Sequence, residues 1–225
     1  MRGGQLGVRD LLTARVGPDG EVVGLEREAR LVALGERLLR ERDPANVGFV
    51  LGAAYASGLP SCAFDLAHAC LLLINLTDPG RARTEMVALV GPGRIVAVQD
   101  IDPMPWPCEP LHPAWDPLVD AFLLIWRANG LPPLIGRRLP ATLRATGLVD
   151  GPLEAHARTD PPGAYPRKHL RDPTRAIRRE IVERRLSTDS EPAAPTGALE
   201  RHLDDPCTVL IGTLLFLAWG RKAEG

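Results

Sequence analysis

Two features near the start of the chain have the residue types that bind nucleotides. The stretch Gly3 to Gly7 (GGQLG) is a glycine-rich turn, and glycine lets a backbone approach a ligand closely. Glu26 ends the apolar run EVVGLE, where a fixed carboxylate can accept hydrogen bonds from ligand hydroxyl groups. A glycine turn, a helix and a strand ending in an acid resemble half of a nucleotide-binding βαβ unit, without the strand that comes first.

The elements that must position these residues alternate along the chain. Apolar, β-branched runs predict strands, and leucines at helical spacing between charged residues predict an amphipathic helix at Glu28 to Arg42. Strands that alternate with helices favour a doubly wound, parallel α/β sheet with helices on its faces. The strands are expected at Glu21 to Glu26, Asn46 to Gly52, from Phe64 onward and at Ile95 to Val98, with the last candidates in the segments DGPLEAHART and TVLIGTLLFLAWGRK.

The turn Gly91-Pro92-Gly93 is expected to precede the strand at Ile95, and Asp100 and Asp102 mark its polar end. Residues 102–114 then contain many prolines and two tryptophans, which predicts a loop without regular structure. A helix with an apolar, aromatic face follows from Trp115 to Asn129.

Size and charge set limits on the kind of protein. The 225 residues fit a single domain spanning 1–225, and 27 basic against 28 acidic residues give no global field for nucleic acid or an anionic membrane. No membrane span or secretory signal is evident, so we expect a cytoplasmic protein with no membrane partner. Four irregularly spaced cysteines favour buried free thiols over a metal site, and no metal is expected.

In this order, the segments GEVVGLEREARLVALGER, GLPSCAFDLAHACLLLINLTDPGRARTEMVALVGPGR and IGRRLPATLRATGL resemble class I S-adenosylmethionine-dependent methyltransferases. The resemblance is to the small-molecule branch that includes ubiquinone/menaquinone methyltransferases. It implies a Rossmann-like sheet with a final antiparallel strand, and S-adenosyl-L-methionine as cofactor at the carboxyl ends of the strands. Its implied activity is methyl transfer to a small, hydrophobic molecule.

The resemblance also implies site residues. Gly4 and Gly7 would close the first cofactor loop, and Glu26 would bind both ribose hydroxyls with Arg27 packed nearby. The alternative for Glu26 is a solvated acid near a helix start, because acids favour helix N-termini.

At the third strand of the family, an aspartate commonly contacts the adenine amino group, and here Gly52-Ala53-Ala54 replaces that motif. Ala53 and Ala54 would hold the adenine by backbone donors and apolar packing, without one charge-assisted hydrogen bond. His68 would lie beneath the sulfonium, and a packed core histidine is the alternative.

The loop at 102–114 lies where the family has substrate-facing insertions, which implies a lid with Trp106 and His112 as substrate contacts. A packed lid without substrate contact is the alternative. No catalytic residue is assigned, and His112 is the candidate base if the acceptor needs one. Arg137 and Arg138 are expected to form a solvated helix start rather than contacts for an anionic substrate.

The family's first strand is central, so its absence here is expected to weaken the sheet and cofactor binding. Three explanations are an upstream start, which we favour, a degraded remnant, and a sheet that closes up for another purpose. A non-catalytic, methyltransferase-like remnant or interaction protein without cofactor binding is therefore the second hypothesis. An NAD-dependent oxidoreductase ranks last, because the glycines of G-x-G-x-x-G and a Tyr-x-x-x-Lys pair are missing.

Two further segments carry predictions. Arg167 to Arg185 is locally basic, but its charges alternate with acids and no aromatic residue lies among them, so nucleic acid is not expected as a partner. Residues 187–197 are rich in proline and serine and predict a flexible loop. The oligomeric state is left open.

Overall fold

A computed structural model describes residues 9–40, 46–157, 159 and 197–224, which fall into two compact units, Met1–Ser61 and Cys62–Gly225. The predicted glycine turn at residues 3–7, the basic segment at 167–185 and the predicted loop up to residue 196 lie outside the described residues. The prediction of one domain over 1–225 therefore stays a prediction.

The first unit contains α1 (Arg9–Val16), β1 (Val22–Glu26), α2 (Ala29–Arg40) and β2 (Val47–Leu51). The strands are parallel, with Glu26 opposite Leu51 at their carboxyl ends. The amphipathic α2 packs against this pair and buries Gly35 and Leu39. The Asn46 side chain fixes the turn before β1, because its Nδ2 donates to the carbonyls of Gly17 at 2.8 Å and Gly20 at 2.9 Å.

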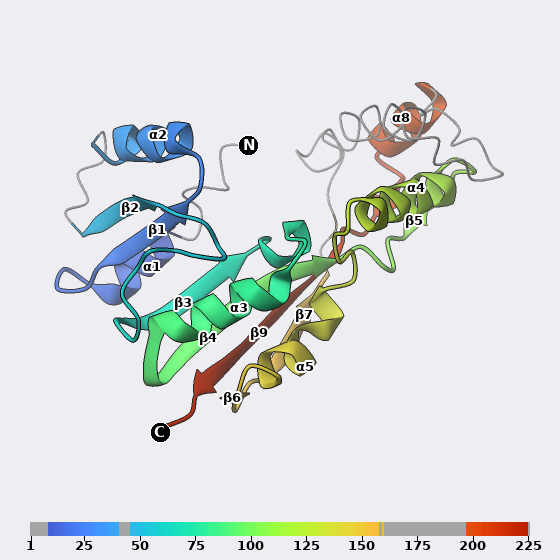
Figure 1. The fold of residues 1–225 in the computed structure, drawn as a ribbon. Helices are drawn as coiled ribbons and strands as arrows, with labels where there is room; N and C mark the ends of the chain where they lie inside the picture. Colours follow the sequence, from blue (N-terminus) through green and yellow to red (C-terminus); the bar gives the residue numbers. More distant parts are fainter. Residues whose placement is uncertain (1–8, 41–45, 158, 160–196, 225) are drawn as a thin grey trace. The chain divides into compact units, whose positions relative to one another are not determined.

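The second unit is built around a mixed sheet whose strands follow the order β3-β4-β9-β6, with β7 also paired to β9 (Figure 1). β3 and β4 are parallel, and β9 runs antiparallel to β4. In chain order its elements are β3 (Phe64–Cys70), η1 (Leu73–Asn75), α3 (Pro79–Leu89), β4 (Val90–Asp102), β5 (Cys108–Glu109), α4 (Trp115–Ala128), η2 (Gly136–Arg138), α5 (Leu139–Arg144), β6 (Leu148–Val149), β7 (Leu153–His156), α8 (Gly197–Asp204), β8 (Val209–Leu210) and β9 (Leu214–Lys222).

Two hydrophobic layers stabilise this unit. In the sheet, β4 alternates between buried and partly exposed residues, with Val96 and Val98 fully buried, and α3 packs across β3 and β4. A second core joins α4, α8 and the short β5-β8 pair around Trp115, which is 1% exposed. The loop after β4 thus belongs to a core of its own.

The α/β class is confirmed, and so are most of the predicted strands and helices. Two local predictions are wrong. The strand β4 begins at Val90, so Gly91-Pro92-Gly93 lies within it, and Gly93 has a φ of +70° there. The proline-rich stretch includes β5, because Cys108 and Glu109 pair with Leu210 and Val209 from a hundred residues away.

Among the described strands, β1 pairs only with β2, and β3 is an edge strand that pairs only with β4. The strands therefore form separate sheets in the two units. None of the described helices is long and apolar enough to cross a membrane.

Candidate functional site

Glu26 lies at the carboxyl end of β1, where a parallel α/β sheet offers its binding edge. Its side chain is partly buried, and Oε1 accepts a hydrogen bond from the backbone N–H of Glu28 at 2.9 Å. This bond orients the carboxylate at the start of α2. The second oxygen, Oε2, and the remaining lone pair of Oε1 give the group capacity to accept from a ligand.

The segment that follows β2 lies beside Glu26. The N–H of Gly52 donates to the Glu26 carbonyl at 2.9 Å, and Ala53 then turns back to pair with Ala56. Gly52 permits this geometry, because a Cβ there would lie 2.4 Å from the Ser57 carbonyl oxygen. The structure thus brings Glu26, Ala53 and Ala54 to one edge of the first unit, with Arg27 exposed next to them.

In the second unit, His68 lies on β3 opposite Ala97 of β4. Its ring is partly buried, and burial lowers the pKa of this imidazole below its usual value, against the opposing effect of a hydrogen bond with the Gln99 side chain. His68 is therefore neutral at pH 7. A neutral ring with one hydrogen-bonded partner is compatible with both the predicted cofactor contact and a packed core histidine.

Two buried carboxylates at the end of β4 have roles that sequence reasoning missed. Asp100 is fully buried and accepts from the N–H of Ile74 at 3.1 Å and of Ile101 at 3.0 Å. Burial raises the pKa of Asp100, although these backbone hydrogen bonds and one from Leu73 oppose the shift. The sequence predicts Asp100 at the end of a strand, but only the fold shows that its carboxylate holds η1 through the Ile74 N–H.

Asp102 is also fully buried, and it forms an ion pair with Arg137 of η2. Its Oδ1 accepts from the Met104 N–H at 3.0 Å. Arg137 is exposed, as expected for a solvated helix start, but its guanidinium also pairs with this buried acid, which the sequence did not predict.

The loop residues Trp106 and His112 lie close to the core around Trp115. The partly buried Trp106 packs edge to face against Trp115, with ring centroids 5.5 Å apart. The Nδ1 atom of His112 accepts from the Ala114 N–H at 3.2 Å, and its ring lies 5.2 Å from that of His202. Since the lone pair of Nδ1 is used, the neutral ring carries its proton on Nε2.

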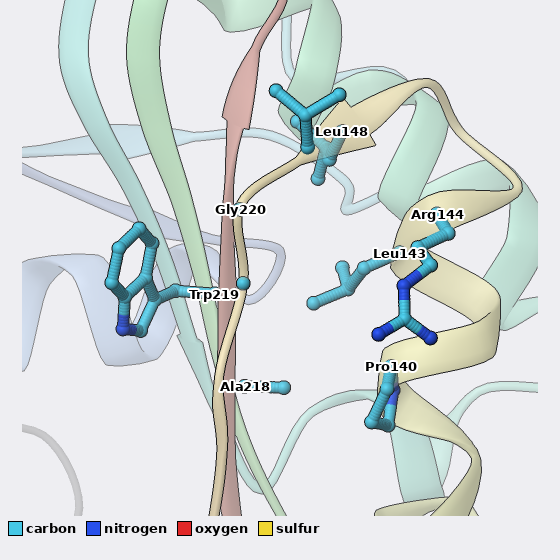
Figure 2. A pocket seen from close by; sticks show the side chains of 9 residues that line it. Pro140, Leu143, Arg144, Leu148, Ala218, Trp219 and Gly220 are labelled. Carbon is cyan, nitrogen blue, oxygen red and sulfur yellow. The ribbon is translucent and has the colours of Figure 1, made fainter.

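A small hollow between α5 and β9 is lined by Pro140, Leu143, Arg144 and the backbone of β9 (Figure 2). The Trp219 side chain points away from these residues. The cavity volume of about 10 Å³ is at the lower limit for a single water molecule. This hollow is therefore too small to hold a nucleotide or an organic substrate.

Solved structures with a similar fold cover most of this chain. A methyltransferase structure from Bacillus halodurans aligns with a TM-score of 0.60 and 13% identity over 91% of this chain and 84% of its own. A phosphoethanolamine N-methyltransferase 2 from Haemonchus contortus, solved with S-adenosylhomocysteine, aligns with a TM-score of 0.59 and 12% identity over 99% of this chain and 47% of its own. The [4+2]-cyclase SpnF aligns with a TM-score of 0.53 and 22% identity over 99% of this chain and 73% of its own.

These alignments, together with the parallel strands and the final antiparallel strand, define a chain with the class I methyltransferase fold. Curated relatives match parts of the sequence. A demethylmenaquinone methyltransferase of Geobacillus is 33% identical over 93 residues, which is 41% of this chain and 40% of the relative. An uncharacterized methyltransferase of Schizosaccharomyces pombe is 29% identical over 128 residues, or 54% and 46%.

The resemblance to methyltransferases drawn from the sequence is thus confirmed. The chain spans less than half the length of these two relatives. No protein-family profile matches the sequence.

Proposed function

We propose that this protein is an S-adenosylmethionine-dependent methyltransferase that acts on a small, hydrophobic molecule. The observation that carries the proposal is the placement of Glu26 beside Gly52 to Ala54, at the carboxyl ends of two adjacent parallel strands. The methyltransferase relatives and the fold support the same activity.

The residues of the first unit fit the nucleoside part of this cofactor. Glu26 has acceptor capacity left for a ribose diol, and its hydrogen bond to the Glu28 N–H holds the carboxylate in place before a ligand arrives. Ala53 and Ala54 offer small side chains and backbone groups as a wall for adenine. We propose Gly4 and Gly7, which lie outside the described residues, and Arg27 as further contacts of this unit. His68 belongs to the second unit, and its predicted cofactor contact is a separate proposal.

The bound cofactor supplies an electrophilic methyl group, and the protein aligns this group with the acceptor and excludes water. No covalent nucleophile of the chain is required. In the second unit, burial lowers the pKa of the His68 ring, so this side chain adds no positive charge there at pH 7.

The acceptor is proposed to contact residues 103–114. Met104 and Trp106 of this stretch pack against the core around Trp115 and are only partly buried, so the part of their surface that stays exposed would suit an apolar ligand. His112 is the candidate base, but its Nδ1 already accepts a hydrogen bond from the Ala114 N–H. The neutral ring therefore presents an Nε2–H group, which can only donate a hydrogen bond. We therefore propose that His112 donates a hydrogen bond to the acceptor and that the base, if the acceptor needs one, is another group.

Calorimetric titration with S-adenosylhomocysteine tests the cofactor site. Glu26→Gln keeps an oxygen for the Glu28 N–H but loses the charge, so the dissociation constant should rise about tenfold or more, as expected for a hydrogen bond to a charged group. Glu28→Gln is the matched control, because this exposed neighbour contributes its backbone rather than its side chain. Equal affinity in both variants would contradict the role of Glu26.

A second candidate function is a non-catalytic or differently catalytic protein on the same fold. Two observations favour it, namely Ala53 in place of an acid and the structural likeness to a cyclase. Incubation with radiolabelled S-adenosylmethionine and a panel that includes demethylmenaquinone separates the two. Neither cofactor binding nor transfer to any acceptor would favour the second candidate, and transfer would exclude it.

A further inference from the structure

The proline-rich stretch from Pro103 to Ala114 is tied to the rest of the second unit at both ends and in the middle. At its start, both backbone groups of Met104 have charged partners. The Met104 N–H donates to Asp102 at 3.0 Å, and the Met104 carbonyl accepts from Arg137 Nη2 at 2.8 Å. Since Arg137 also pairs with Asp102, these two side chains close a ring of hydrogen bonds around one residue.

Gly136 explains how Arg137 reaches this position. A Cβ at Gly136 would lie 2.6 Å from the Phe216 ring and 3.1 Å from the backbone of Ile101. The absence of a side chain lets η2 approach β4 and β9 closely. The guanidinium of the next residue can then reach the buried carboxylate of Asp102 at the end of β4.

The middle of the stretch is held by neighbours distant in sequence. The Trp115 indole Nε1 donates to the Trp106 carbonyl at 2.7 Å, and the Ile211 N–H donates to the Pro107 carbonyl at 3.1 Å. The Pro110 carbonyl lies 2.7 Å from Nε2 of His202 on α8. Each bond uses a backbone group that a free loop would leave to water.

We propose that residues 103–114 form a fixed wall of the acceptor site rather than a lid, and that Asp102 and Arg137 are the positioning residues at its base. That this wall borders a methyl acceptor rests on the proposed function, but the rigidity of the wall can be tested without activity. A wall that is shaped before the ligand binds selects acceptors by fit and spends no binding energy on ordering the loop.

The test compares Arg137→Met with Arg138→Met in the full chain by NMR. Arg138 is the exposed neighbour on the same short helix and serves as the control. In Arg137→Met the Met104 amide should exchange with solvent about tenfold faster or more, since its acceptor Asp102 loses its ion pair. The indole N–H signals of Trp106 and Trp115 should shift, while that of Trp219 on β9 stays in place.

Unchanged exchange at Met104 and unchanged indole signals in Arg137→Met would overturn the proposal. So would fast exchange of the Met104, Cys108 and Ala114 amides in the unsubstituted protein, because it would show an open lid. If Arg137→Met does not fold, Arg137→Lys gives the same comparison with a smaller effect, since lysine keeps the charge but lacks the planar fork.

Kinetics then test the link to the acceptor. With demethylmenaquinone as the probe acceptor, Arg137→Lys should raise the acceptor KM about tenfold while the dissociation constant of S-adenosylhomocysteine is unchanged. Equal effects on both ligands would indicate a general structural role and would contradict the positioning role. If the unsubstituted protein transfers no methyl group, the proposed function fails, while the exchange experiment still decides whether the wall is fixed.

Discussion

The substitution Gly35→Ala tests the packing that places β1 and its last residue, Glu26. Helix propensity alone predicts that alanine at this position of α2 stabilises the protein by up to about 1 kcal/mol. The structure predicts the opposite sign, because a Cβ at Gly35 would lie 2.6 Å from the Phe49 ring. The other edge of the ring already packs against Gly24, since a Cβ there would lie 2.7 Å from the ring, so the ring has little room to move away from Gly35.

Overpacking of this kind costs about 1 to 3 kcal/mol, so the net effect of Gly35→Ala should be a destabilisation of about 1 kcal/mol after the helix gain is subtracted. All four tryptophans lie in the second unit, so tryptophan fluorescence does not report on this site. Hydrogen exchange of the β1 and β2 amides does report on it. A destabilisation of about 1 kcal/mol should make this exchange about fivefold faster in Gly35→Ala, because 1.4 kcal/mol corresponds to tenfold.

Adding Phe49→Leu to Gly35→Ala should recover part of the loss, because the smaller side chain makes room for the new methyl group. Slower exchange in Gly35→Ala alone would show that propensity outweighs the contact. That result would refute the packing described for this unit.

Three other substitutions address the second unit. Because the pKa of Asp100 is raised in the folded state, its protonated form stabilises the fold fully below the usual aspartate pKa of about 3.9. This stabilisation is lost as the pH rises through the raised pKa. In urea unfolding, the unsubstituted protein should therefore lose stability relative to Asp100→Asn across that pH range. Trp115→Phe removes the bond to the Trp106 carbonyl and should lower the free energy of unfolding by about 1 to 3 kcal/mol, measured in the same way. His112→Asn keeps an acceptor for the Ala114 N–H and should reduce methyl transfer by less than about tenfold, whereas loss of a general base costs about a hundredfold or more.

Local sequence patterns predicted the elements around Glu26 well. The apolar run before Glu26 and the leucines of α2 have the periods of a strand and a helix, and each pattern lies within a few residues. The pattern places Glu26 at a strand end, and the resemblance to the methyltransferase family adds Ala53 at the end of the next strand. The sequence therefore contained the candidate cofactor edge of the first unit.

Contacts between distant residues could not be read in the same way. The Asp102–Arg137 pair joins residues 35 positions apart, and the His202 contact with Pro110 joins residues 92 positions apart. Periodicity predicts which face of an element is buried but not which residue lies against it, so the sequence predicts the exposed position of Arg137 but not its pairing with Asp102. The same limit hid β5, because its short pairing depends on a strand near the other end of the chain.

The most direct test of the methyl-donor site is an NMR titration of the ¹⁵N-labelled protein with S-adenosylhomocysteine. The Glu28 amide reports on the Glu26 carboxylate, because its N–H donates to Oε1. A saturable shift of this amide together with those of Ala53 and Ala54 is the expected result, and Glu26→Gln should weaken it. A titration that leaves these three amides unmoved at millimolar ligand would contradict the assignment of this edge as the cofactor site.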